Sequence, residues 1–409
     1  MTEKIKNASR LAASLVVALY AIELLDEFIY GLHGAALPYL KTDLDLTYTQ
    51  IGLLFTLPGL VAIFAEPIIG LLGDTKHRRA LMLGGLVATA LSLFLVGIGQ
   101  TYLVILFAFV IMGTASGAYV NLAQATLIDR DLNRSAPTMA RWTILGAIGV
   151  AASPLIAATT FYLGYGWRGL YLSLVAVAGL YAMILIRHRF NGDHVSGEES
   201  VSPKILFQNL ITGLTNRELI RWMLLTELAD LMLDKLLEVT GLYFHDVAGV
   251  SLVAASAAVA VSTISGLIGG AVLVPVLERV NGLRVLRISA VIAFIAYVSF
   301  LLIPSVPIKY ILIAVVAFST AAWYPVLKAK CYDALPGQSG LVMAVTSLGN
   351  VSSLFVPVIL GALADAFGLG WAMWLLALGP VALFVGLGRE TSPPDPLSRI
   401  EEHNSREGE

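Results

Sequence analysis

Three carboxylates interrupt the first long apolar stretch of the sequence: Glu23, Asp26 and Glu27. On a helix, Glu23 and Asp26 share one face with Tyr30, because residues three, four and seven positions apart are neighbours. The surrounding residues are apolar enough to cross a bilayer, where an ionisable side chain is costly and marks a site for a substrate, an ion or a proton. We therefore expect the chemistry of this protein to be centred on these acids.

The same Glu-x-x-Asp pattern recurs at Glu227 and Asp230, 204 positions later in a chain of 409 residues. This offset also pairs acids, glycines and tryptophans at predicted helix ends: Asp74 with Glu278, Asp129 with Asp333, Gly164 with Gly368, Gly166 with Gly370 and Trp167 with Trp371. Such repetition predicts two parallel repeats related by an axis along the membrane normal, with a binding site at mid-depth between them.

The second copy of the pattern begins a longer acidic stripe. Its four acids follow one another at steps of three and four residues, so a regular α-helix places them on one face: Glu227, Asp230, Asp234 and Glu238. Lys235 can pair with Glu238 or with the neighbouring acids. Basic residues elsewhere could instead neutralise some of these carboxylates: Arg141, Lys328 and Lys330.

The composition places these acids in a membrane protein. The chain is 57% hydrophobic and 13% charged, with a mean hydropathy of +0.82, whereas soluble domains carry roughly 25% charged residues. A β-barrel is excluded because the apolar runs last about twenty residues and do not alternate. Cys331 is the single cysteine and the six histidines have no metal-ligand spacing, so we expect no metal, no cofactor and no nucleic-acid partner.

Hydropathy predicts an all-α integral membrane fold with twelve spans of about twenty residues. The spans are 13–38, 50–72, 80–99, 102–127, 140–163, 167–187, 218–243, 251–277, 284–303, 309–330, 341–363 and 371–388. They form two six-helix bundles, at 1–190 and 218–390, joined by a polar linker at 191–217 that contains a candidate amphipathic helix. A polar tail follows at 391–409.

Basic residues predict the orientation, because cytoplasmic loops are rich in Lys and Arg. With the N-terminus inside, the cytoplasmic segments contain most of the basic residues near helix ends: Lys4, Lys6, Arg10, Lys76, Arg78, Arg79, Arg130, Arg134, Arg187, Arg189, Arg279, Arg284 and Arg287. Both termini are then cytoplasmic. We expect a monomer in the lipid bilayer of a bacterial inner membrane.

Residues 70–79 resemble the loop 2–3 motif of the major facilitator superfamily, Gly-x-Leu-x-Asp-Arg-x-Gly-Arg-Lys. Gly70, Asp74, Arg78 and Arg79 fit this motif, whereas Thr75 replaces a basic residue. The resemblance, together with the twelve spans and the central linker, implies alternating access by two rocking bundles. It also implies that these residues hold the cytoplasmic side of one conformer closed; the alternative is a basic loop that serves topology alone.

The stretch from Gly149 to Ala158 is similar to the fifth-helix antiporter motif of the same superfamily, Gly-x-x-x-Gly-Pro-x-x-Gly-Gly. Gly149 and Pro154 match, whereas Ser153, Ala157 and Ala158 stand in place of glycine. Small residues let helices approach closely, and we expect this face to pack against a helix of the other bundle and seal an exporter. Ordinary packing in a membrane bundle is the alternative.

We expect six carboxylates to carry protons or contact the substrate: Asp26, Asp230, Glu23, Glu227, Glu27 and Asp234. Further candidates for lining the cavity lie in the first, fourth and tenth spans: Tyr30, Tyr119, Asn121, Gln124, Trp323 and Tyr324. The excess of acid favours a secondary transporter that exports a small cationic or amphiphilic molecule in exchange for protons. Proton-coupled uptake of a metabolite and a receptor that binds without transport are the alternatives. The residues support no enzyme.

Overall fold

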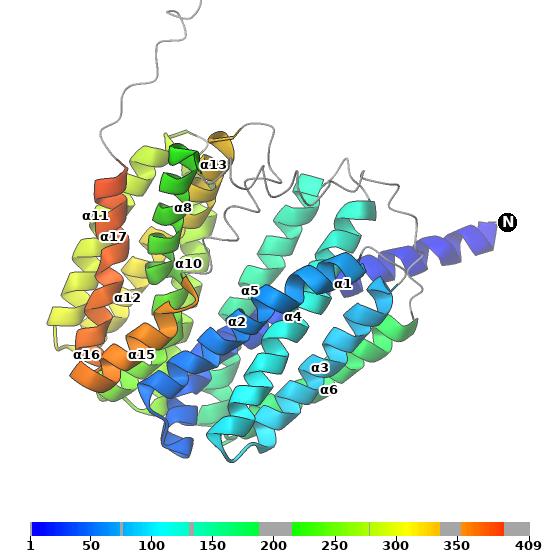
Figure 1. The fold of residues 1–409 in the computed structure, drawn as a ribbon, viewed down its shortest axis with the longest axis horizontal. Helices are drawn as coiled ribbons and strands as arrows, with labels where there is room; N and C mark the ends of the chain where they lie inside the picture. The colour runs from blue at the N-terminus through cyan, green and yellow to red at the C-terminus, as the bar shows by residue number, and fades with distance from the viewer. Residues whose placement is uncertain are drawn as a thin grey trace, which may run out of the picture.

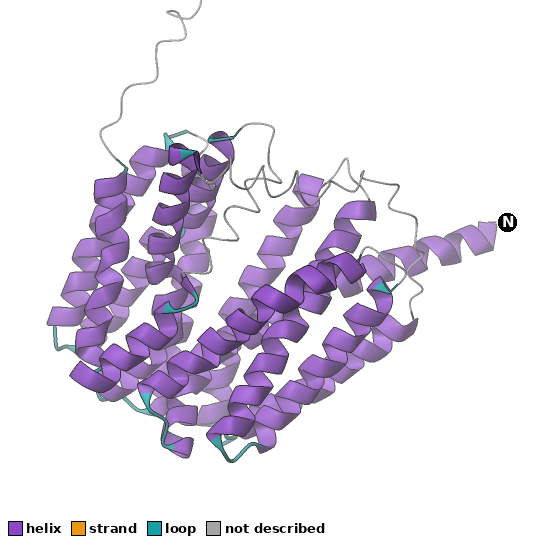
Figure 2. Cartoon of the chain, viewed as in Figure 1, coloured by secondary structure: helices purple, strands orange, loops and turns teal. Residues whose placement is uncertain are grey.

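The computed structural model describes residues 2–73, 77–130, 135–187, 215–277, 279–335 and 353–387, which form helices joined by short turns, with no strand among them (Figure 2). The first half contains α1 (Thr2–Leu44), α2 (Tyr48–Gly73), α3 (Arg78–Ile98), α4 (Tyr102–Arg130), α5 (Ser135–Tyr162) and α6 (Trp167–Arg187). The second half contains α8 (Arg217–Asp230), η2 (Leu231–Lys235), α9 (Leu236–Leu242), η3 (Tyr243–Val247), α10 (Leu252–Leu277), α11 (Gly282–Leu302), α12 (Val306–Thr320), α13 (Trp323–Asp333), α15 (Val356–Phe367), α16 (Leu369–Ala372), η4 (Met373–Ala377) and α17 (Leu378–Gly386). We call the continuous helix made of α8, η2, α9 and η3 the seventh helix.

The predicted all-α membrane fold is confirmed. Within the described ranges, nine helices are long and apolar enough to cross a bilayer. Neither α1 nor the seventh helix is among them, which agrees with the carboxylates that both helices carry. Most of the linker predicted at 191–217 and the whole tail predicted at 391–409 lie outside the described residues, and the span predicted at 341–363 is described only from residue 353.

Two glycines show the internal repeat in the backbone itself. Gly164 and Gly368, which stand 204 positions apart, have φ angles of +84° and +87°. Each follows a helix, α5 or α15, and precedes the first turn of the next. Only glycine adopts this left-handed conformation without steric cost, so the same sharp connection occurs at the equivalent place in both halves.

The two halves lie side by side, with α2 to α6 on one side and α8, α10 to α13 and α15 to α17 on the other (Figure 1). They meet along three sets of helices: α1 with α9 and α10, α2 with α15, and α5 with α10. The interface therefore brings α1 and the seventh helix together, which are the two helices with the acidic patterns.

The crossing of α2 and α15 has almost no clearance. A Cβ atom on Gly52 would lie 2.3 Å from the carbonyl oxygen of Pro357, and one on Gly361 would lie 2.3 Å from that of Tyr48. Real Cβ atoms do not approach oxygen so closely, so both positions require glycine. These two contacts hold the halves together at the end of the molecule where α1 connects to α2.

Gly149 lies against α1 of its own half. A Cβ atom there would lie 2.6 Å from the carbonyl oxygen of Leu24 and 3.0 Å from the backbone nitrogen of Phe28. The expectation that this glycine packs against the other bundle is therefore wrong. The pattern of small residues identified a face of α5 that packs closely, and at Gly149 the neighbour is α1, although α5 also packs against α10 of the second half.

Gly149→Leu should destabilise the first half of the molecule rather than open a leak between the halves. The new side chain would push α1 away from α5, and overpacking of this kind costs about 1–3 kcal/mol. We expect a lower unfolding temperature of the purified protein in detergent. Gly84→Leu is the matched control, because nothing lies within 4 Å of a Cβ at that glycine of α3. Equal unfolding temperatures of the two variants would contradict this packing.

Candidate functional site

Asp26 and Glu23 of α1 lie inside the first half, where neutral groups satisfy them. The hydroxyl of Tyr119, a fully buried residue of α4, donates a hydrogen bond of 2.5 Å to Asp26 Oδ1, and Ser116 donates a second. Glu23 is 7% exposed and accepts a hydrogen bond from Trp142 of α5. Within the described residues, neither carboxylate has a basic partner, so proton binding at either one breaks no ion pair.

A second group of acids lies where the halves meet. Glu27 of α1 is within electrostatic range of Asp234 of the seventh helix. Tyr30 of α1 interacts electrostatically with Glu27 and with three acids of the seventh helix: Asp230, Asp234 and Glu238. We call Glu27, Asp230, Asp234 and Glu238 the interface acids. The structure thus joins predicted site residues that are about 200 positions apart in sequence.

Lys235 is the basic residue of this group. Its Nζ lies 2.7 Å from Glu238 Oε1 and 4.0 Å from Asp230 Oδ2. The pairing that the sequence suggested for Lys235 and Glu238 is confirmed. Because Asp234 is exposed, its carboxylate remains open to a molecule that enters between the halves.

A π-helical turn, η2, explains why the acids of the seventh helix are not equivalent. The turn covers Leu231–Lys235 and lies between Asp230 and Glu238. It adds a residue to one helical turn. Asp234, within the turn, is exposed, whereas Glu238, after it, is 7% exposed. The acids of the expected stripe thus differ in exposure, although Asp230, Asp234 and Glu238 all interact electrostatically with Tyr30. π-Turns inside α-helices are frequent at functional sites.

Glu227 belongs to a third environment, nearer the end where the seventh helix begins. It accepts a hydrogen bond from Ser353 and interacts electrostatically with Lys328 of α13. Lys328 is one of the basic residues that the sequence suggested as a partner for such an acid. Glu227, which repeats the position of Glu23, also lies within electrostatic range of Lys235 and Asp230, so it adjoins the interface acids.

The cavity-lining candidates of α4 and α13 fall in different places. Tyr324 is 54% exposed and lies within electrostatic range of Asp230 and Asp234. Trp323 is fully buried, and its indole N–H donates to Ser289 Oγ at 2.8 Å, so it packs inside the second half. On α4, Asn121 is exposed and Gln124 is half-buried.

The two arginines of the basic loop bond to helix C-termini of their own half. Arg78 Nε donates to the carbonyl oxygen of Gly73 at 2.7 Å, at the last residue of α2. Arg79 Nη2 donates to the carbonyl oxygen of Ile186 at 2.6 Å, near the end of α6. Cations stabilise such helix ends. Asp74 lies outside the described residues, and Gly70 is in α2.

A polar network that the sequence did not reveal joins the halves at the opposite end. Asp365 of α15 accepts hydrogen bonds from the backbone N–H groups of Tyr48 and Thr49, both at 2.8 Å, and from Thr49 Oγ1 at 2.5 Å. Asp246 accepts a bond of 2.7 Å from the Tyr48 hydroxyl and lies 3.3 Å from Lys41 Nζ. We call these five residues the latch.

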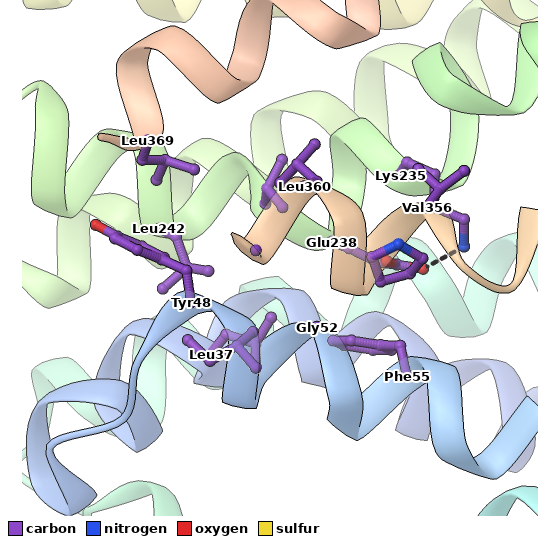
Figure 3. A pocket seen from close by; sticks show the side chains of 14 residues that line it. Leu37, Tyr48, Gly52, Phe55, Lys235, Glu238, Leu242, Val356, Leu360 and Leu369 are labelled. Carbon is purple, nitrogen blue, oxygen red and sulfur yellow. Dashed lines mark hydrogen bonds and ion pairs between the residues drawn. The ribbon is translucent and has the colours of Figure 1, made fainter. Parts of the chain in front are cut away.

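A small cavity of about 20 Å³ lies between the latch and the interface acids (Figure 3). Its walls are mainly apolar side chains of α1, α2, the seventh helix and α15, such as Phe55 and Leu360. Lys235 and Glu238 form its polar part, with their ion pair drawn as a dashed line. The volume is close to that of one water molecule, so the route past the acids is closed at this end.

Comparisons with known proteins agree with this architecture. The family model of the Major Facilitator Superfamily matches residues 19–353. Among solved structures, a single-residue mutant of the nucleoside transporter NupG matches with a TM-score of 0.75 and 13% identity, covering 92% of this chain and 100% of that one. A bacterial homologue of the human lysosomal transporter Spinster, inward-facing and unoccupied, matches with a TM-score of 0.72, 16% identity and coverage of 92% and 97%. At this identity the likeness shows the fold. No curated protein sequence matches the chain.

Proposed function

The chain belongs to the Major Facilitator Superfamily, and on that premise we propose that it exports a small cationic or amphiphilic molecule in exchange for protons. It is a multi-pass membrane protein and a secondary transporter, which points away from an enzyme. The observation that carries the proposal is that Glu27 of α1 lies within electrostatic range of Asp234 of the seventh helix, and that Tyr30 of α1 interacts with both of these acids and with Asp230. Carboxylates from two bodies that move relative to one another can exchange a cation for protons as they separate.

Asp26 is the proposed principal proton carrier of the first half. It lies next to Glu27 in the sequence, so a proton bound there changes the field at the interface acids. Its hydrogen-bond partners are neutral, and protonation therefore costs no ion pair. Glu23 supports it in the same environment.

The direction of transport rests on the charge of the site and on the resemblance at the fifth helix. With the orientation that the basic residues predict, the latch faces outward and the interface acids are reached from the cytoplasm. A cation from the cytoplasm would bind between Glu27 and Asp234, and protons arriving from outside would release it after the latch opens. Uptake reverses this order and is the competing function.

The test uses purified protein in liposomes with one known orientation and three probes: tetraphenylphosphonium, the neutral nucleoside uridine, and benzoate. We expect proton flux that depends on tetraphenylphosphonium, with the cation leaving through the latch side. Uridine tests the alternative raised by the name of NupG. Inward, proton-driven accumulation of any probe would identify an importer, and binding without flux would identify a receptor.

Asp230→Asn should abolish this coupled flux while the protein stays folded. Asparagine has nearly the same shape, but it neither carries a proton nor attracts a cation, and it leaves Lys235 paired with Glu238. The loss of an acid–base group typically costs about a hundredfold or more in rate. The measurement is the initial rate of proton uptake after addition of tetraphenylphosphonium. A wild-type rate would remove Asp230 from the mechanism.

A further inference from the structure

Lys235 occupies a position that a substrate cation could otherwise use. It lies at the end of η2, with its side chain 16% exposed, between Glu238 at 2.7 Å and Asp230 at 4.0 Å. Its ion pair with Glu238 forms the polar part of the small cavity, and Asp230 interacts electrostatically with Asp234 and Glu238. The ammonium group of Lys235 thus interacts with two of the four interface acids, Glu238 and Asp230.

The two remaining acids come one from each half. Glu27 of α1 and Asp234 of the seventh helix interact electrostatically, and Asp234 is exposed. A molecule with one positive charge can lie between them. A second positive charge on the same molecule would meet the ammonium group of Lys235 rather than a free carboxylate, and like charges in a site of low dielectric repel strongly.

We propose that Lys235 is a specificity-determining residue that restricts the site to molecules with a single positive charge. The inference rests on the proposed function, because it assumes that the interface acids bind a cation. It goes further by naming the charge of the substrate and the group that sets it. Specificity of this kind depends on a repulsive element as well as on an attractive one.

Two substitutions should change selectivity in opposite directions. Lys235→Met removes the repulsion and frees Glu238 and Asp230, so a molecule with two separated charges gains a second anionic partner. Glu238→Gln releases the ammonium group toward Asp230, where it competes with any cation that enters. The double variant removes the Lys235 and Glu238 charges together and should bring selectivity back toward that of the unmodified protein.

The experiment measures binding and transport of two probes by the full-length protein in nanodiscs and liposomes: tetraphenylphosphonium, with one charge, and decamethonium, with two. In Lys235→Met, the affinity ratio should move toward decamethonium by about tenfold or more, the size expected for one new charge contact. In Glu238→Gln, tetraphenylphosphonium should bind about tenfold more weakly, by the same reasoning. Lys235→Arg should behave as the unmodified protein.

Lys330→Met is the matched control for the loss of a lysine, because Lys330 forms an ion pair of the same i,i+3 spacing with Asp333, at 2.8 Å in α13. It should leave the ratio unchanged. If the unmodified protein binds tetraphenylphosphonium but Lys235→Met keeps its ratio, the specificity role is wrong and the proposed transport of cations stands. If neither probe binds to the unmodified protein or to any variant, both proposals fail. Should Lys235→Met not fold, unchanged tetraphenylphosphonium affinity in Glu238→Gln overturns the inference.

Discussion

Asp26→Asn protein should lose proton-driven transport while it remains folded in the membrane. Asparagine keeps an oxygen that can accept the hydrogen bond from Tyr119, now 2.5 Å from Asp26 Oδ1, so the packing of α1 against α4 is preserved. What disappears is the ability to bind a proton. We expect the rate of uphill transport to fall by about a hundredfold or more, the usual effect of removing a proton-transferring group.

Two assays distinguish the coupling of transport to protons from the movement of the substrate itself. Uphill transport is driven by a pH step across the liposome membrane, and exchange of labelled for unlabelled tetraphenylphosphonium is followed at equal pH on both sides. Asp26→Asn should fail in the first assay and retain the second. Tyr119→Phe is the control, because it removes the hydrogen-bond donor but keeps the carboxylate, and it should retain uphill transport. Wild-type uphill transport by Asp26→Asn would exclude this residue as the carrier.

Asp365→Ala should open the closed end of the molecule. The substitution removes all three hydrogen bonds that hold the start of α2 to α15. A lost helix cap costs about 0.5–2 kcal/mol, and the two conformers of a transporter differ by only a few kcal/mol. We therefore expect the population of molecules open at the latch to rise by about tenfold, since 1.4 kcal/mol corresponds to that factor.

A cysteine introduced at Leu360 reports this opening, because Leu360 lines the small cavity and is 4% exposed. The background carries Cys331→Ser, which removes the single native cysteine. A membrane-impermeant maleimide should label the reporter about ten times faster in Asp365→Ala, in line with the population change. Asp333→Ala, which removes the acid of a different ion pair, should not change the rate. Equal labelling in all variants would mean that the latch does not hold this end closed.

The sequence predicted the helices and the two acidic patterns because both depend on local information. An apolar run of about twenty residues indicates a membrane span, whichever helices surround it. The repeated Glu-x-x-Asp pattern indicated that α1 and the seventh helix occupy equivalent positions in the two halves. Spacing also placed Glu27 and Asp230 on helices that face the centre. The sequence shows that the repeat pairs Gly164 with Gly368, and the structure shows that both have a positive φ angle.

The remaining features depend on contacts between distant segments. Asp365 bonds to backbone groups 317 and 316 positions away. Because nearly every residue has a backbone N–H group, the sequence does not indicate which of these groups bonds to a distant side chain. The π-turn η2 contains neither proline nor glycine, so the sequence did not indicate its presence or the different exposure of Asp234 and Glu238. The small residues around Gly149 identified a close contact, but not which helix makes it.

The bonds from Tyr48 and Thr49 to Asp365 also have a consequence for the backbone of α2. Their donors are the first amide groups of that helix, and the acceptor belongs to the other half of the chain. A helix normally obtains this partner from its own sequence. When the halves part, the first turn of α2 must either bind water or unwind. The bonds between Thr47 and Gln50 stay within this helix end whatever the halves do. The hydration of the amide groups of Tyr48 and Thr49 is therefore coupled to the relative position of the two halves.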